Sequence, residues 1–173
     1  MKDCTSGGNS CSMKILVTGG AGFIGSHVAD ALLAGGHDVL VIDDLSTGKR
    51  ANVPERARFE QGDIRDGAFV ARVFADFVPE VVTHQAAQTS VAVSTREPLR
   101  DAEINVLGSL HILEQCVKHK VKQLVFASTG GAIYGEVLEG TRASESTAPN
   151  PLSPYACSKF AVEKYLGAYA REH

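Results

Sequence analysis

The chain has 173 residues, of which 44% are hydrophobic and 21% charged, and its formal net charge is -3. These values fit one globular domain with a sizeable core. The small net charge, without any block of Lys or Arg, argues against a nucleic-acid or polybasic membrane surface, and no apolar run approaches the roughly 20 residues of a membrane span.

The first twelve residues are small and polar and lack the apolar stretch of a signal peptide. Since Met13 is a plausible alternative start, residues 1–12 are predicted to be a disordered leader. The chain has four cysteines: Cys4, Cys11, Cys116 and Cys157. No histidine cluster accompanies them at zinc-site spacing, so we expect free thiols, no metal site and a cytoplasmic location.

From Met13 onward, short apolar runs alternate with longer helical patterns. Strands are expected at 14–19, 38–44, 57–64, 80–87 and 122–129, and helices at 26–37, 66–77, 99–120 and 153–173. Strand and helix in alternation indicate right-handed crossovers and a parallel sheet with helices on both faces. The sequence therefore predicts an α/β fold over 13–173, a Rossmann-type doubly wound sheet of about five strands.

Local signals mark the ends of two of these helices. The first helical pattern spaces Ile24, Val28 and Leu32 four residues apart, which predicts a helix. It stops at the glycine pair 35–36, a common helix terminator. The last helix is expected to start at Ser153, with a proline in its first turn.

The stretch VTGGAGFIGSH joins the first strand to the first helix. It contains Gly-x-Gly-x-x-Gly at Gly20, Gly22 and Gly25, and also a glycine at Gly19. Residues without side chains let the backbone approach a pyrophosphate, and the helix N-terminus then offers free N–H groups. A simple tight turn is the alternative interpretation, but a strand before and a helix after are the context that a dinucleotide site needs.

An acid follows the glycine turn at the expected distance. Asp43 ends the second strand, eighteen residues after Gly25, where a carboxylate would bind the adenosine ribose hydroxyls. A carboxylate there repels a 2′-phosphate, so NAD is favoured over NADP. The nearby Lys49 and Arg50 keep NADP as an alternative.

Tyr155 and Lys159 lie four residues apart on the last helix, so they share a face. A neighbouring ammonium stabilises phenolate, which makes this tyrosine a credible proton acceptor for oxidising an alcohol. Ser128 and Thr129 follow the fifth strand at the sheet edge where ligands bind in such folds. Taken alone, the Tyr–Lys spacing is common on surface helices, and the hydroxyls could simply cap turns.

Together these features resemble the extended short-chain dehydrogenase/reductase family and, within it, the bacterial UDP-glucose 4-epimerases. The motifs that carry the resemblance occur in order: VTGGAGFIGSH, DDLSTGK, GDI, HQAA, NVLGS, VFASTGGAIYG and SPYACSK. They run from Met13 to His173, and the resemblance implies NAD as the cofactor.

The resemblance also implies a role for each matching position. The implied cofactor contacts are Gly19, Gly22, Phe23, Ile24 and Gly25 at the pyrophosphate, Asp43 and Asp44 at the adenosine ribose, Asp63 and Ile64 at adenine, Ala86, Ala87 and Asn105 toward the nicotinamide, and Ser128, Tyr155 and Lys159. Thr129 would bond the reacting sugar hydroxyl, Tyr155 would act as base, and Lys159 would bind the nicotinamide ribose. Because two glycines lengthen the loop after Thr129, the Ser128 and Thr129 roles could shift by one.

The implied reaction is epimerisation of a UDP-hexose. The tyrosine takes the proton of the 4-hydroxyl while NAD takes the hydride; the keto sugar turns over, and the hydride returns to its other face. Related sugar-nucleotide decarboxylases, reductases or dehydratases remain alternatives, although Gly130 and Gly131 replace the acidic pair of dehydratases. A catalytically incomplete NAD-binding module is the alternative from another class.

Family members continue for well over a hundred residues beyond the Tyr–Lys helix. We therefore expect this chain to be an N-terminal fragment whose substrate domain is absent. It should bind NAD weakly and show little or no epimerase activity alone. Family dimers pair the long helix with the Tyr–Lys helix, so a homodimer through 99–120 and 153–173 is also expected.

Overall fold

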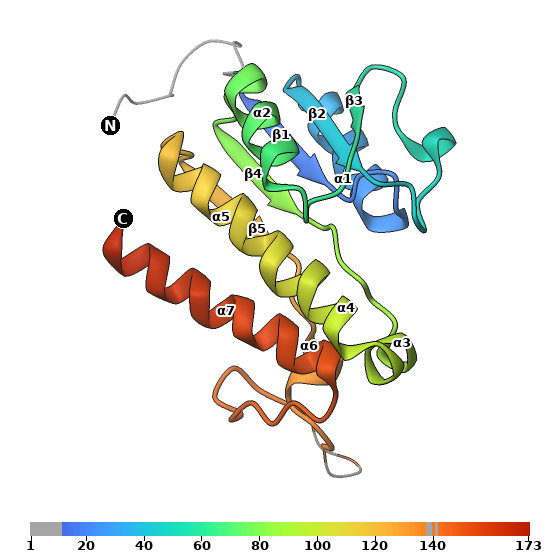
Figure 1. Ribbon diagram of the computed structural model, residues 1–173, viewed down its shortest axis with the longest axis vertical. Helices are drawn as coiled ribbons and strands as arrows, with labels where there is room; N and C mark the ends of the chain where they lie inside the picture. Colours follow the sequence, from blue (N-terminus) through green and yellow to red (C-terminus); the bar gives the residue numbers. More distant parts are fainter. Residues whose placement is uncertain (1–11, 138–139, 141) are drawn as a thin grey trace.

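The computed structural model describes residues 12–137, 140 and 142–173. Its centre is a five-stranded parallel sheet of order β3-β2-β1-β4-β5 (Figure 1). The strands are β1 (Lys14–Thr18), β2 (Asp38–Asp43), β3 (Arg58–Gln61), β4 (Val81–His84) and β5 (Gln123–Phe126). The expected α/β doubly wound fold is thus confirmed, while the expected leader and its Cys4 and Cys11 lie almost wholly outside the described residues.

The strand order places a topological switch point at β1. The chain runs outward from β1 to β2 and β3, then crosses back to β4 on the other side of β1. In register, Leu16 of β1 lies between Leu40 of β2 and Val82 of β4. In sheets of this type, ligands bind beyond the carboxyl ends of the strands that flank such a point.

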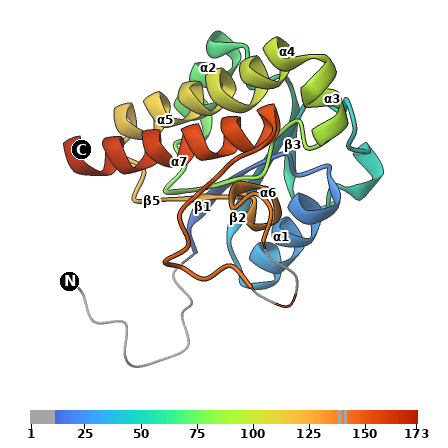
Figure 2. The ribbon, with the colours of Figure 1, turned by 90° about the horizontal axis from the view of Figure 1, so that it is seen from below.

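Helices cover both faces of the sheet (Figure 2). They are α1 (Phe23–Ala34), α2 (Gly67–Phe77), α3 (Val91–Arg96), α4 (Pro98–Ala102), α5 (Gly108–Lys118), α6 (Gly130–Ile133) and α7 (Pro154–Glu172), with short turns η1 (Arg50–Asn52) and η2 (Glu103–Leu107). Helices α2 and α5 lie on one face, and α1 lies on the other; α7 packs beside α4 and η2.

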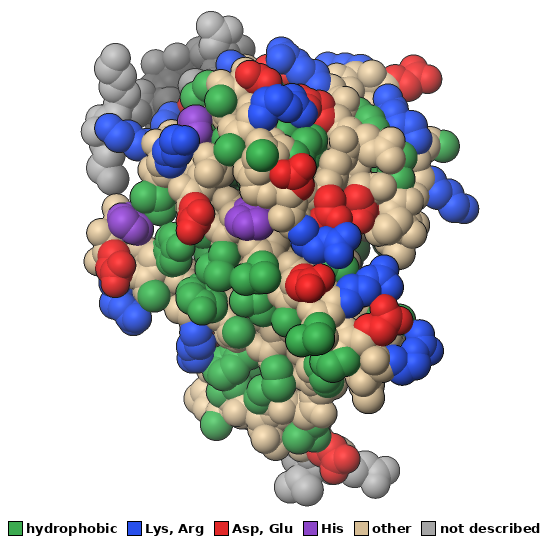
Figure 3. All heavy atoms as spheres, in the orientation of Figure 1, with side chains coloured by type: hydrophobic (Ala, Val, Ile, Leu, Met, Phe, Trp, Pro, Cys, Tyr) green, Lys and Arg blue, Asp and Glu red, His purple; other side chains and the backbone are tan. Residues whose placement is uncertain are grey.

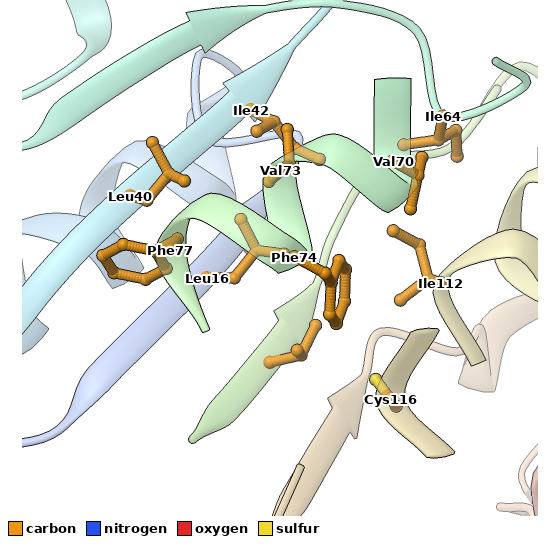
Figure 4. Packing of buried hydrophobic residues seen from close by; sticks show 11 residues of the cluster. Leu16, Leu40, Ile42, Ile64, Val70, Val73, Phe74, Phe77, Ile112 and Cys116 are labelled. Atoms are coloured by element: carbon orange, nitrogen blue, oxygen red, sulfur yellow. The ribbon is translucent and has the colours of Figure 1, made fainter. Parts of the chain in front are cut away.

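Alternate residues of the strands feed two separate cores. Leu16, Leu40 and Ile42 pack with α2 and α5 around the fully buried ring of Phe74 (Figure 4). The intervening residues Val17 and Val41 pack with α1 on the other face. Burial on both faces explains why the central strands β1 and β2 are continuous apolar runs.

The helix and its glycine terminator are confirmed, since α1 ends at the C-cap Gly35. The apolar spacing does not mark the buried face, because Ile24 is 62% exposed, whereas Gly25, Ala29 and Leu33 are buried. An added Cβ on Gly25 would strike the carbonyl of Gly19. The start of this helix therefore buries its smallest residues, because it must approach the glycine turn closely.

The single helix expected over 99–120 is interrupted. Between α4 and α5 the chain makes a π-helical turn, η2, in which the N–H of Gly108 donates to the carbonyl of Glu103. Such turns concentrate at functional sites, and this one holds Asn105. The start expected for the last helix is confirmed, because the Ser153 hydroxyl accepts from the N–H of Ala156 at 3.2 Å.

Three further observations concern the whole described part of the chain. None of its helices is long and apolar enough to cross a membrane. No group of three or more His, Cys, Asp or Glu side chains among the described residues is placed to hold a metal ion. Cys116 and Cys157 are free thiols, the first buried and the second exposed.

Candidate active site

The glycine turn after β1 folds back onto the end of β4. Gly19 has φ +68°, and a Cβ there would lie 2.6 Å from the backbone nitrogen of Ala86. Gly22 is the N-cap of α1 and provides no side-chain cap, so the N–H groups at the helix N-terminus are left for a ligand such as a pyrophosphate. Beside them, Phe23 is 79% exposed and, like Ile24, available to a ligand.

Asp43 holds the glycine turn in place. Its carboxylate accepts from the backbone N–H of Ala21 at 3.0 Å and from that of Leu45 at 2.8 Å. The side chain is nearly buried at the carboxyl end of β2. Each carboxylate oxygen keeps a further acceptor position, so two ribose hydroxyls fit the carboxylate chemically. Asp44, by contrast, is exposed and accepts from Ser46.

The residues expected at adenine follow β3. The Asp63 carboxylate accepts from the Arg65 guanidinium at 2.5 Å, and this hydrogen bond lowers the pKa of Asp63. The Asp63 side chain lines an open hollow together with Glu103 and His111. Ile64 is buried in the core, and its carbonyl accepts from Nδ1 of His111 at 3.0 Å. The Asp63 side chain is therefore paired rather than free.

A buried amide fixes the loop after β4. Asn105 accepts from the N–H of Gln88 at 2.9 Å and donates to the carbonyl of Gln88 at 3.0 Å. The π-helical turn is thus clamped to the segment that directly follows Ala86 and Ala87. This clamp sets the position of both alanines beside the glycine turn.

A directional hydrogen-bond chain crosses the core beneath this loop. Ser109 Oγ donates to the carbonyl of Asn105 at 2.6 Å, so it accepts from Nε2 of His84 at 2.9 Å. Nδ1 of His84 then accepts from the Thr18 hydroxyl at 2.6 Å, which itself accepts from the N–H of Ala86. Burial, with the charge of Lys159 as a second cause, lowers the pKa of His84 to about 3.

Helix α7 places Lys159 in the interior and Tyr155 at a half-buried position. The ammonium nitrogen of Lys159 lies 4.3 Å from the ring centroid of Phe126, which ends β5. Burial lowers the pKa of Lys159 to about 8, while the charge of Asp101 opposes the shift. This buried lysine therefore lies at the carboxyl end of β5.

The two hydroxyls after β5 are placed differently. Ser128 is exposed and donates to Glu163 of α7 at 2.5 Å. Thr129 is half-buried at the start of α6, and its hydroxyl makes no capping bond there. A Cβ added to Gly130 or Gly131 would meet nothing within 4 Å, so the backbone here is openly accessible.

The structure thus gathers the glycine turn, Asp43, Ala86, Ala87 and Asn105 about the switch point. Three buried polar residues near them escaped the sequence interpretation: Thr18, His84 and Asp101. For Thr18 and His84, the usable signal was a polar residue closing an otherwise apolar strand. Asp101 gave no signal, because an acid in an exposed-looking helix is ordinary.

Fold and site together define a dinucleotide-binding α/β protein with a Tyr–Lys helix at the sheet edge. Residues 15–173 match the model of the "NAD dependent epimerase/dehydratase family", and the chain belongs to this family.

Individual relatives agree with this assignment. The chain is 43% identical over 162 residues to the UDP-glucose 4-epimerase of Mycolicibacterium smegmatis, covering 91% of this chain and 51% of that protein. It superimposes on a Thermus thermophilus UDP-glucose 4-epimerase in complex with NAD with a TM-score of 0.91 and 56% identity, over 92% of this chain and 51% of the other. For a Thermotoga maritima UDP-glucose 4-epimerase with UDP-glucose, the TM-score is 0.90 at 51% identity, over 92% and 52%. The chain therefore spans about half the length of these relatives.

Proposed function

We propose that this chain is the NAD-binding part of a UDP-glucose 4-epimerase. The observation that carries the proposal is that an uncapped α1 N-terminus and the Asp43 carboxylate lie at the switch point, while the buried Lys159 lies at the carboxyl end of β5, on the β4 side of the sheet. The α1 N-terminus suits a pyrophosphate, the Asp43 carboxylate suits ribose hydroxyls, and Lys159 suits the far end of a dinucleotide. Crystallised relatives are described as epimerases with NAD or UDP-glucose, which supports the same conclusion.

NAD rather than NADP is the expected cofactor. Asp43 would repel a 2′-phosphate on the ribose that it binds. Arg50, one of the two cations that kept NADP as an alternative, stacks its guanidinium 4.7 Å from the Phe59 ring centroid. We therefore expect NAD to bind more tightly than NADP.

Bound NAD supplies a hydride acceptor, and the chain supplies the proton chemistry. Tyr155 is the proposed base for the sugar 4-hydroxyl, and Lys159 stabilises its phenolate form. Thr129 is the proposed partner of that hydroxyl, because Ser128 already donates to Glu163. Gly130 and Gly131 offer no proton-transfer group, which favours epimerisation over dehydration.

We also propose that two copies associate through α4, η2 and α7. Hydrophobic side chains gather on this face (Figure 3), and Leu99, Leu107 and Tyr165 are exposed there. Sedimentation analysis should show a dimer. The double substitution Leu107→Glu with Tyr165→Glu should disrupt this dimer, whereas Ala34→Glu on α1 should not.

A UDP-hexose is the proposed substrate. The free thiols of Cys116 and Cys157 support a cytoplasmic location.

Titration calorimetry with NAD and NADP tests the cofactor directly. NAD binding with weaker or undetectable NADP binding is expected; no NAD binding, or a preference for NADP, would contradict the proposal. Product analysis on UDP-glucose with the NAD-loaded chain, at high protein concentration and long incubation because little turnover is expected of the chain alone, tests the reaction type. UDP-galactose is the epimerase product, whereas a deoxy keto sugar would indicate a dehydratase. Tyr155→Phe should abolish any turnover and retain NAD binding.

A further inference from the structure

A buried carboxylate connects three segments next to the Tyr–Lys pair. Asp101 on α4 is 1% exposed. One of its oxygens accepts from Nε2 of Gln88 at 2.8 Å and from Nδ2 of Asn105 at 3.0 Å. The other accepts from the hydroxyl of Ser158 on α7. Asp101 therefore joins the loop after β4, the π-helical turn and the residue directly before Lys159.

The side-chain amides of Gln88 and Asn105 donate to one oxygen of Asp101, and the Ser158 hydroxyl, which also lies 3.0 Å from the carbonyl of Pro154, contacts the other. An ionised carboxylate can accept from all three groups. A buried negative charge is costly without a compensating positive one. Lys159, adjacent to Ser158 and also buried, is the cation on which the charge of Asp101 acts.

The groups around Lys159 leave few other sources of negative charge. His84 on β4 faces it and is neutral at ordinary pH, since its pKa is about 3. Phe126 on β5 offers only its ring face. On α7 itself, Tyr155 and Glu163 each lie one turn away, and Glu163 is engaged by Ser128 at the surface.

We propose that Asp101 is a positioning residue of the Tyr–Lys helix, fixing its first turns through Ser158 and supplying the negative charge that the buried Lys159 ammonium needs. The inference rests on the proposed role of Lys159 and goes beyond it, by naming what keeps that lysine charged and in place. Without Asp101, burial would act on Lys159 unopposed and favour the neutral amine. A neutral amine would no longer stabilise the Tyr155 phenolate.

The test is to follow the Lys159 ε-amine by NMR as a function of pH, in the chain labelled with isotope-enriched lysine. The signal of Lys159 is assigned as the one that Lys159→Met removes. Asp101→Asn should lower the pKa of Lys159 by about one unit. The matched control, Glu163→Gln, removes an acid one turn from Lys159 and should leave that pKa within the error of the titration. An unchanged pKa in Asp101→Asn, or an equal fall in Glu163→Gln, would overturn the inference.

Ser158→Ala keeps the test decisive if Asp101→Asn does not fold. It breaks the link to α7 and leaves the carboxylate, so Lys159 should still titrate as in the unmodified chain. The amides of 156–159 should exchange with solvent at least about tenfold faster, because α7 loses its buried anchor. Unchanged exchange would reject the positioning role. NAD calorimetry on the unmodified chain is independent of both readouts, so a failure of the proposed function is distinguishable from a failure of this inference.

Discussion

The hydroxyl of Thr18 donates to Nδ1 of His84 at 2.6 Å, joining the carboxyl ends of β1 and β4 at the switch point. The same hydroxyl accepts from the N–H of Ala86, next to the glycine turn. His84 is 2% exposed and must accept at Nδ1, so it is neutral in the folded state. The shape of the cofactor crevice therefore depends on an uncharged histidine.

This dependence predicts acid sensitivity. His84 has a folded pKa of about 3, below the 6.5 of an unperturbed histidine, so between these values the unfolded chain binds the extra proton. Stability should therefore fall as pH drops from 6.5 toward 3, by up to about 1.4 kcal/mol per pH unit from this group. Urea unfolding at pH 7 and pH 5 measures the effect. His84→Gln should be less stable at pH 7 but lose less between the two pH values; an unchanged difference would contradict the prediction.

The glycine turn should tolerate no side chain at Gly19. Gly19→Ala places a methyl group 2.6 Å from a backbone nitrogen at a φ of +68°, so the turn must shift or strain by about 1–3 kcal/mol. Calorimetry should show NAD binding weakened at least about tenfold. Gly167→Ala is the matched control, because a Cβ there meets nothing within 4 Å on the exposed side of α7. Equal NAD affinity in both variants would count against the proposed pyrophosphate site.

The sequence was sufficient for the sheet because strands buried on both faces must be continuous apolar runs, and β1 and β2 are. It also singled out Asp43, Tyr155 and Lys159 as candidate site residues, because their spacing from the glycine turn or from each other is local information. It could not place Asp101 against Ser158, 57 residues away, because no local pattern records a pairing between distant helices.

The buried face of α1 and the π-helical turn could not be predicted for a different reason. Apolar spacing predicts that α1 is a helix, but close approach to the glycine turn selects Gly25 and Ala29 for burial. A helical pattern likewise cannot distinguish a π turn from an α turn, so the interruption at Asn105 was invisible. Packing distance and hydrogen-bond register, rather than hydrophobicity, decided both cases.

The core around Phe74 should dominate the stability of the domain. Its ring is fully buried between the sheet and α5, so Phe74→Ala should cost about 3–5 kcal/mol of unfolding free energy. Denaturant unfolding measures this cost. Phe23→Ala removes the same ring from a largely exposed site and should change stability by less than about 0.5 kcal/mol. Similar losses in the two variants would mean that the two rings are not buried as described.

The cap of α7 should set how firmly the Tyr–Lys pair is held. Ser153 accepts from the N–H of Ala156, one of the otherwise unpaired donors in the first turn. Ser153→Ala should therefore cost about 1 kcal/mol, and Ser153→Asp should restore it, because aspartate caps at least as well and favours the positive helix N-terminus. Thermal unfolding of the three proteins measures stability. Hydrogen exchange at Ala156 should rise in the alanine variant and return in the aspartate variant, since the Ala156 N–H is the one that the cap accepts from. Equal loss in both variants would show that the hydroxyl contributes packing rather than a cap.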